Sequence, residues 1–360
     1  MTPLSIAFFG SSLVSAYWNG AATYYRGIVK ALAANGHRVT FYEPDAYDRQ
    51  QHRDIPDPDW ADVVVYSAAD ETGVLHALDN ARSADLIVKA SGVGVFDALL
   101  EARVPALKRP GAVAAFWDVD APATLDRIAA DPDDPFRALI PAYDLVLTYG
   151  GGPPVVEKYR SFGAGACVPI YNGLDPDTHH PALPEAQFAC DLGLVANRLP
   201  DREQRIDVFF VEVAKELPDR RFLLAGNGWA DKKLPPNVSR LGHLYTRDHN
   251  AFNASALAVL NVSRDSMAAY GFSPATRVFE AAGAGACVLT DAWDGIAEFF
   301  EPGKEILVAE SGPAVAEQLA RLTPEEASRV GHAARERALA DHTYAQRVAL
   351  LERVLEGSGR

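Results

Sequence analysis

The sequence predicts an α/β protein built from two doubly wound, Rossmann-like domains. Short apolar runs alternate with helical segments, and this pattern restarts near residue 188 after a linker without periodicity. The length agrees with this, because 360 residues, 48% of them hydrophobic, are enough for two domains with large cores.

The first half of the chain predicts a parallel sheet. Its expected strands are LSIAFFG, HRVTFYE, DVVVYSA, DLIVKAS, AVAAFWD and DLVLTYG. The stretches between them are mostly long enough for a crossover helix, as parallel strands require. We place the N-terminal domain at residues 1–171, followed at 172–188 by a linker rich in Pro, Asp and His.

The second half predicts another sheet of the same kind. Its expected strands are CDLGLVAN, RFLLAGNG, ALAVLNVS, ACVLTDA and KEILVAES, with helices such as REQRIDVFFVEVAKEL between them. We place this C-terminal domain at residues 189–338. The tail from Pro324 to Glu356 predicts two helices, the last of them within residues 339–360.

Composition excludes several classes of function. A net charge of −14 and a pI near 5.1 argue against a protein that binds the phosphate backbone of nucleic acid. Cys167, Cys190 and Cys287 each lie in or beside an apolar run, which indicates reduced core thiols without metal-binding spacing. The N-terminus lacks a basic leader and no window has the length of a membrane span, so we expect a soluble cytoplasmic protein without an integral membrane segment.

The segment GFSPATRVFE suggests an anion site. Ser273 is a good N-cap and Pro274 suits the first helical position. A helix N-terminus attracts phosphate, and Thr276 and Arg277 strengthen that attraction. Glu280, one turn deeper, would accept hydrogen bonds from ribose hydroxyls. The alternative is an ordinary amphipathic helix whose Arg and Glu are solvated.

Other loops at the carboxyl ends of the second set of strands carry similar chemistry. They supply guanidinium groups for a diphosphate, small residues where the backbone approaches a ligand, and a backbone edge for a base. The candidate residues there are Arg198, Arg202, Asn227, Gly228, Leu244, Tyr245 and Arg264.

The first half offers two candidate catalytic carboxylates, Asp118 and Asp120, after the strand AVAAFWD. Asp120 could take a proton from an acceptor hydroxyl, or could merely cap the helix that follows. The segment SGVGVFDALL approaches a dinucleotide fingerprint, but Asp97 stands at its third glycine position. A nicotinamide oxidoreductase is therefore disfavoured.

Several of these stretches together resemble the CgeB-like glycosyltransferases, a family named after a spore maturation protein and part of the GT-B class. The matching stretches are GSSLVSAYWNGAATYYRGIVKALAANGHRVTFYEPD, FWDVDAPATLDRI, LGLVANRLPDRE, LGHLYTRDHNAFNASALAVLNVSRDSMAAYGFSPATRVFEAAGAGACVLTD and GIAEFFEPGKEILV, and they span nearly the whole chain. The resemblance implies two domains facing a central cleft, with the nucleotide sugar in the C-terminal domain and the acceptor in the N-terminal domain. It also implies a final helix that returns to the N-terminal domain.

The resemblance assigns Glu280 to the ribose and YNGLDP to a turn at the domain junction. Many retaining relatives carry another Glu eight residues earlier, where this chain has Phe272, so neither retention nor inversion is implied. The class normally works without a divalent metal, and arginines and a helix end would carry the charge of the leaving group.

The sequence thus predicts a metal-independent glycosyltransferase of the hexosyltransferase type, without a cofactor. It would move a sugar from a nucleoside-diphosphate donor, UDP or dTDP, to a hydroxyl of a small molecule or glycan. One alternative is a catalytically idle GT-B module that binds nucleotide sugar or scaffolds a partner enzyme. Another is a sugar epimerase, for which His243 is the available acid or base.

Overall fold

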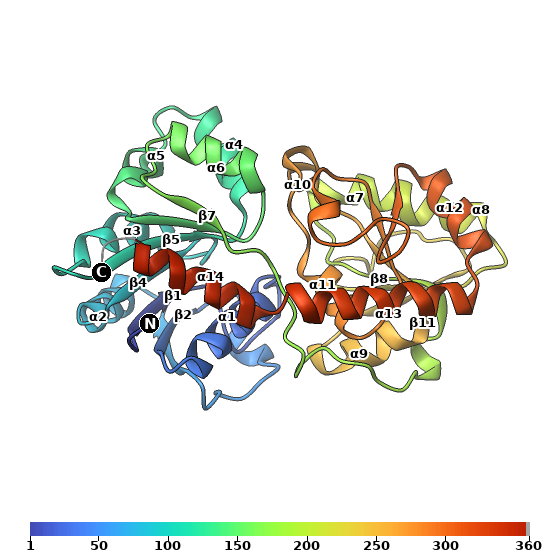
Figure 1. Cartoon of the computed structure of the whole chain (residues 1–360), viewed down its shortest axis with the longest axis horizontal. Coiled ribbons are helices and arrows are strands. Elements are labelled where there is room, and N and C mark those ends of the chain that lie inside the picture. The colour runs from blue at the N-terminus through green and yellow to red at the C-terminus, as the bar shows by residue number, and fades with distance from the viewer. Residues whose placement is uncertain (358–360) are drawn as a thin grey trace. The chain divides into compact units, whose positions relative to one another are not determined.

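The computed structural model describes residues 1–357, which form two compact α/β units (Figure 1). The first unit contains residues 1–171 and 344–357, and the second contains residues 172–343. The segment 172–188, expected to be a linker, therefore groups with the second unit. Residues 339–343 also belong there, so the helix that returns to the first unit begins at Tyr344.

The first unit has one parallel sheet of seven strands in the order β3-β2-β1-β4-β5-β6-β7. The strands are β1 (Ser5–Phe9), β2 (Arg38–Asp45), β3 (Asp62–Ser67), β4 (Leu86–Ala90), β5 (Val113–Asp118), β6 (Leu145–Thr148) and β7 (Cys167–Pro169). The helices are α1 (Ala22–Ala34), α2 (Glu71–Ala81), α3 (Asp97–Arg103), α4 (Ala121–Ala130), α5 (Pro135–Leu139), α6 (Gly152–Ser161) and α14 (Tyr344–Gly357), with short 3-10 turns η1 (Arg49–His52), η2 (Pro105–Leu107) and η3 (Ile140–Ala142). The central strands β4 and β5 are buried along their whole length, as their apolar runs predict.

Helix α14 belongs to the first unit, although it follows the second unit in the chain. With α1 it covers one face of the seven-stranded sheet, where Tyr344, Val348 and Leu351 join a core that includes Phe8 and Trp117. At Gly27 of α1, an added Cβ would stand 2.0 Å from the ring of Tyr344, so only glycine allows the two helices to pack this closely.

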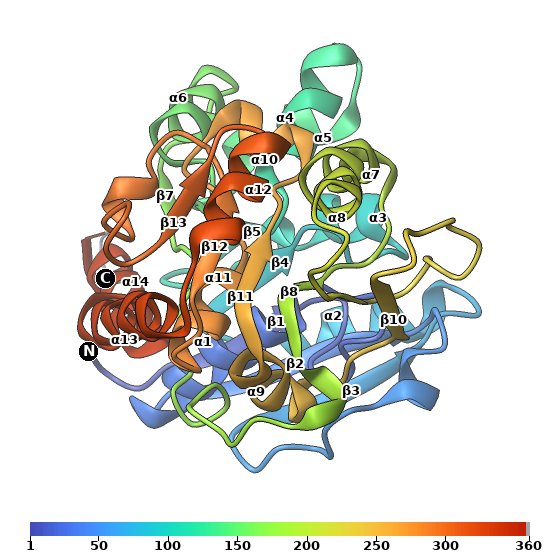
Figure 2. The ribbon, with the colours of Figure 1, turned by 90° about the vertical axis from the view of Figure 1, so that its right-hand side faces the viewer.

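The second unit has a parallel sheet of six strands in the order β10-β9-β8-β11-β12-β13. The strands are β8 (Cys190–Val195), β9 (Phe222–Ala225), β10 (Val238–Gly242), β11 (Ala256–Asn261), β12 (Val288–Asp291) and β13 (Leu307–Ala309). The helices are α7 (Pro200–Ile206), the π-helical η5 (Asp207–Val211), α8 (Glu212–Glu216), α9 (Thr246–Ser255), α10 (Asp265–Tyr270), α11 (Thr276–Gly283), α12 (Gly312–Arg321) and α13 (Pro324–Asp341), with 3-10 turns η4 (Ala186–Phe188) and η6 (Ile296–Glu298). Helices α7, α8 and α12 lie on one side of this sheet, and α9, α11 and α13 on the other (Figures 1 and 2).

Both sheets reverse their strand order next to their first strand, between β1 and β4 and between β8 and β11. In doubly wound folds, ligands bind outside the carboxyl ends of the strands at this reversal. The loops that follow β8 and β11 in the second unit, and β4 and β5 in the first, are therefore the places to look for a site.

Two edge strands escaped the sequence analysis. Strand β7 has only the residues CVP, and β10, with the residues VSRLG, is exposed over most of its length. Neither forms the apolar run that identifies a buried parallel strand.

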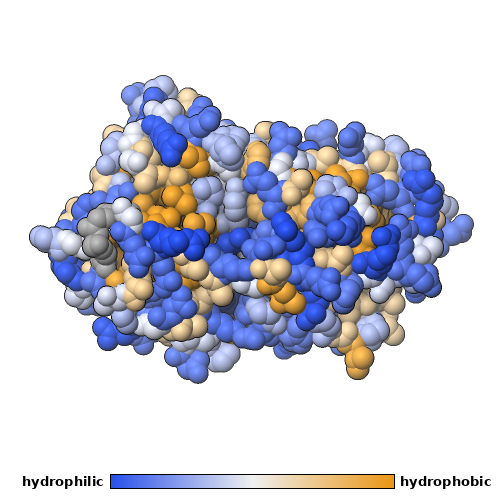
Figure 3. Space-filling model, in the orientation of Figure 1, coloured by the Kyte–Doolittle hydropathy of each residue, from blue (hydrophilic) through white to orange (hydrophobic). Residues whose placement is uncertain are grey.

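The face of the molecule drawn in Figure 3 is mostly hydrophilic, with smaller hydrophobic groups between the hydrophilic residues. Within residues 1–357, no helix combines the length and the hydropathy needed to cross a membrane. The three cysteines are free thiols and buried, as expected.

Candidate functional site

The helix expected at Ser273 begins three residues later. Helix α11 spans Thr276–Gly283, and Ala275 is its N-cap residue, so the prediction that Ser273 caps the helix was wrong. The buried hydroxyl of Ser273 instead donates to the carbonyl of Gly271 at 2.9 Å. The loop before the helix contains Phe272 in the left-handed region, at φ 47°.

The first turn of α11 is fixed by two asparagines. Asn172 donates to the carbonyl of Pro274 at 2.9 Å and accepts from the Thr276 hydroxyl at 3.2 Å. Arg277 donates to Oδ1 of Asn261, the last residue of β11, at 2.9 Å. Burial lowers the pKa of Arg277. Thr276 and Arg277 thus lie at the carboxyl edge of the sheet, where sequence analysis had placed them, while Asn172 and Asn261 were missed.

Glu280 lies one turn further along α11, with its carboxylate between two histidines that sequence analysis did not select. Its Oε1 lies 3.9 Å from Nε2 of His179, and its Oε2 lies 3.8 Å from Nδ1 of His249. The alternative of a solvated Glu is wrong, because Glu280 is buried. Burial lowers the pKa of His179 to about 4, although Glu280 acts in the opposite direction.

Arg198 is engaged by acidic side chains of its own unit. It makes a two-pronged contact with Glu203 at 2.8 Å and a second ion pair with Asp231 at 2.9 Å. The hydrogen bond from Arg198 lowers the pKa of Glu203 to about 2. A diphosphate would have to displace these carboxylates before Arg198 could bind it.

The other two candidate arginines are also held within the second unit. Arg202 donates to the carbonyl of Asn197 at 2.7 Å. Arg264 pairs with Asp201 at 2.6 Å, which ties the loop after β11 to α7. The structure therefore gathers the arginine loops at one end of the sheet, but Arg277 is the cation that lies on the same helix as Glu280.

The loop after β9 approaches the loop after β8 very closely. Gly226 has a φ of 126°, and an added Cβ would stand 2.1 Å from the carbonyl oxygen of Ala196. The backbone N–H of Asn227 donates to Asn197, and its side-chain amide contacts His243 at 3.3 Å. The carbonyl of Gly228 accepts from Arg198 at 3.3 Å. The close approach seen here is between two loops of the protein, so the predicted approach of the backbone to a ligand stays a prediction.

Leu244 and Tyr245 connect β10 to α9. Leu244 is buried with Phe188, Cys190 and Phe252 in a small apolar cluster, so its side chain stabilises the fold. Tyr245 precedes α9 as its N-cap residue, and its ring contacts that of His243 edge to face at 4.5 Å. The contacts of His243 with Tyr245 and Asn227 give it a structural role.

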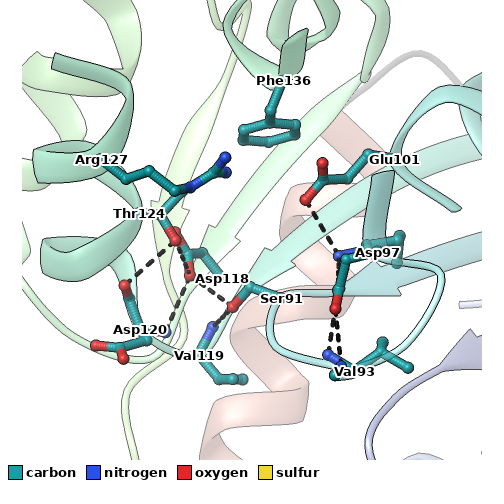
Figure 4. Close-up of polar contacts among 12 residues, drawn as sticks. Ser91, Val93, Asp97, Glu101, Asp118, Val119, Asp120, Thr124, Arg127 and Phe136 are labelled. Carbon is teal, nitrogen blue, oxygen red and sulfur yellow. Dashed lines mark hydrogen bonds and ion pairs between the residues drawn. The ribbon is translucent and has the colours of Figure 1, made fainter. Parts of the chain in front are cut away.

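In the first unit, Asp118 is the centre of a buried hydrogen-bond network (Figure 4). Its Oδ1 accepts from the hydroxyls of Ser91 at 2.7 Å and Thr124 at 3.1 Å, and from the backbone N–H of Asp120 at 2.9 Å. Its Oδ2 accepts from the hydroxyl of Tyr159 at 2.5 Å. A carboxylate that accepts from four donors fixes the loop after β5 and has little capacity left as a base.

Asp120 follows at the N-cap position of α4, but its side chain makes no capping hydrogen bond. The interpretation of Asp120 as a helix cap was therefore wrong. Its backbone carbonyl accepts from the N–H of Thr124 at 3.0 Å, which starts the helix without the carboxylate. Asp118 thus fixes the backbone of Asp120 at the start of α4.

The loop after β4 lies beside this network (Figure 4). Asp97 accepts from the backbone N–H groups of Val93 and Gly94, and from the buried ammonium of Lys89 at 2.7 Å. Lys89 also pairs with Glu101 at 3.3 Å, and burial raises the pKa of Glu101. In a dinucleotide-binding loop, backbone N–H groups at these positions bind phosphate. Here they donate to the Asp97 carboxylate instead.

Comparisons with known proteins bear on the family and the fold. Residues 202–353 match a family model described as glycosyl transferase-like. No curated protein sequence matches the chain. Among solved structures, sucrose-phosphate synthase from Thermosynechococcus elongatus aligns over 99% of this chain and 100% of its own, with 16% identity and a TM-score of 0.70.

Two further structures give similar values. Anabaena Alr3699/HepE, solved in complex with UDP-glucose, aligns over 98% of this chain and 100% of its own, with 14% identity and a TM-score of 0.69. AviGT4, a glycosyltransferase involved in avilamycin A biosynthesis, aligns over 99% of both chains, with 19% identity and a TM-score of 0.60. These structures share the GT-B fold with the chain over nearly its whole length.

Proposed function

We propose that this protein transfers a sugar from a nucleoside-diphosphate sugar, with UDP or dTDP as the nucleotide, to a hydroxyl group of an acceptor. The observation that carries the proposal is the position of Glu280 on α11, one turn beyond Thr276 and Arg277, at the carboxyl edge of the sheet. This arrangement offers a cation and backbone N–H groups to a diphosphate, and a carboxylate to the ribose.

The donor site proposed here is smaller than the set of arginines in the sequence suggests. Arg277 and the first turn of α11 would carry the charge of the departing diphosphate, because Arg198 and Arg264 are already paired with acids. The complex of Anabaena Alr3699/HepE with UDP-glucose supports the choice of a uridine nucleotide. We propose that the reaction needs no divalent metal, since a cationic side chain and a helix end replace it.

The acceptor would bind to the first unit, near the loop after β5. Asp120 is the carboxylate there that would take the proton from the acceptor hydroxyl. Asp118 would act as a positioning residue, because its Oδ1 accepts the backbone N–H of Asp120 and so fixes that turn. Asp118 itself would not be the base, because its buried carboxylate already accepts a hydrogen bond from Tyr159.

A panel of donors tests the proposal. The full chain would be incubated with UDP-, dTDP- and GDP-sugars, and release of free nucleotide would be measured with and without candidate hydroxyl acceptors. We expect release from a UDP- or dTDP-sugar that increases with the correct acceptor. Tight nucleotide binding without release under any acceptor would instead indicate an idle module that binds nucleotide sugar.

A further inference from the structure

Three potential metal ligands converge in the second unit from segments far apart in the sequence. His179 lies in the loop after Asp175, His249 lies on α9 and Glu280 lies on α11. One ligand atom from each of the three lies within 4.8 Å of the others. Neither histidine is close enough to Glu280 for a hydrogen bond, because the separations are 3.9 and 3.8 Å.

The burial of His179 is the second observation. This side chain is 3% exposed, and its Nε2 atom, which points toward Glu280, has no hydrogen-bond partner. Buried polar atoms in native proteins normally have one. A cation held jointly by the three side chains would give this nitrogen a partner.

Contacts between α9 and the loop that contains His179 fix the positions of the two imidazoles. Asn250, the residue after His249, donates to the carbonyl of Thr178 at 2.9 Å and accepts from the N–H of His180 at 3.2 Å. Asn250, on α9, therefore binds the backbone of the residues immediately before and after His179. On the other side, a Cβ at Gly283 would stand 2.8 Å from the carbonyl oxygen of His179, so this glycine lets α11 approach the same loop.

The ligand set identifies the class of ion. Two imidazoles and one carboxylate form a frequent zinc site that keeps a fourth position for water. Tetrahedral zinc ligands stand about 3.4 Å apart, whereas the three ligand atoms here lie within 4.8 Å of one another, so the side chains must move closer together to bind zinc. Magnesium and calcium prefer oxygen ligands and fit this set poorly.

We propose that His179, His249 and Glu280 bind a divalent transition-metal ion such as zinc, and that this ion excludes nucleotide from the Glu280 carboxylate. The second half of this statement rests on the proposed function, in which Glu280 binds the ribose. An ion bound to Glu280 occupies the oxygens that the ribose hydroxyls need. Metal binding to Glu280 would therefore inhibit the binding of the nucleotide.

The experiment titrates the full chain, first freed of metal with EDTA and desalted, with zinc against a chromophoric chelator. The variants are His179→Phe and His249→Gln, and His332→Gln on the exposed face of α13 is the matched control. We expect one zinc ion bound per chain, affinity at least about tenfold weaker in the two site variants, and no change in the control. Magnesium should not compete. Circular dichroism before titration verifies that each variant is folded.

UDP binding by calorimetry, with and without zinc, completes the test. Zinc should weaken UDP binding to the parent protein and to the His332→Gln control, and this zinc dependence should disappear in both site variants. Equal zinc affinity in the parent and both site variants would overturn the metal site, and simultaneous binding of zinc and UDP would overturn the shared use of Glu280. Absence of UDP binding to metal-free protein would count against the proposed function, while the zinc titration still decides the metal site.

Discussion

Arg277 donates a hydrogen bond to Oδ1 of Asn261 at 2.9 Å, so the first turn of α11 is tied to the carboxyl end of β11. This bond places the start of the helix beside the reversal of strand order, where doubly wound sheets bind their ligands. Glu280 follows on the next turn of the same helix. The predictions about the donor depend on this relationship.

Replacing Glu280 with Ala should weaken nucleotide binding. Charge-assisted hydrogen bonds to ribose hydroxyls are worth about 1.5–3 kcal/mol each, so the affinity for UDP or dTDP should fall at least about tenfold. Calorimetry with the metal-free protein measures this. Glu298→Ala, which removes an exposed carboxylate from η6 of the same unit, is the matched control and should bind like the parent. Equal affinity in the Glu280 variant would remove its ribose role.

Replacing Asp120 with Asn should separate chemistry from donor binding. An amide keeps the shape and polarity of the carboxylate but cannot accept a proton, so turnover should fall by about two to four orders of magnitude. Donor affinity should hardly change, because Asp120 lies in the first unit. Near-normal turnover would mean that another group, or the departing phosphate itself, deprotonates the acceptor.

Asp118→Asn is the companion variant and should act through stability. The buried Asp118 accepts from Ser91, Thr124 and Tyr159, and an amide nitrogen would face a donor at one of its two positions. We expect the free energy of unfolding to decrease by about 2–3 kcal/mol. Urea denaturation of both aspartate variants measures this, and an Asp118 variant as stable as the parent would contradict the network in Figure 4.

Activity should persist in EDTA. The proposed donor site neutralises the diphosphate with Arg277 and a helix end, so chelation removes nothing that the reaction needs. If zinc binds at Glu280, chelation should even raise the activity of a preparation that contains zinc. Turnover before and after EDTA, and after addition of magnesium, is the measurement. Complete loss restored by magnesium would refute the donor site as described.

The three thiols should be inert in the native protein. Burial raises the pKa of the thiols of Cys167, Cys190 and Cys287 to about 12. At pH 8, only about one thiol in ten thousand is then ionised, and the thiolate is the reactive form. A colorimetric disulfide reagent should detect three thiols after unfolding and react with none of them quickly before it. Rapid reaction of a native thiol would contradict the burial.

The fold was predictable because the buried strands carry its signal. Strands such as β4 and β5 are apolar along their whole length, and the crossover helices between strands have typical spacing. Strands β7 and β10 could not be identified in the same way, since β7 has three residues and β10 is mostly exposed at an edge.

The site was predictable only in part, because tertiary contacts override local signals. Ser273 and Pro274 form a strong helix start in sequence, yet the carbonyl of Pro274 binds Asn172 and the hydroxyl of Ser273 binds Gly271, so the helix begins later. His179 and His249 meet at Glu280 through packing alone, and no spacing in the sequence indicates it. Arg198 pairs with the nearby Glu203 and with Asp231 in another loop, and the sequence alone shows neither pairing.

A crystal structure with UDP tests the central claim most directly. The account predicts the ribose hydroxyls within hydrogen-bond distance of the Glu280 carboxylate, and the diphosphate against the first turn of α11 beside Arg277. Nucleotide bound in the first unit, or in the second unit away from α11, would contradict it.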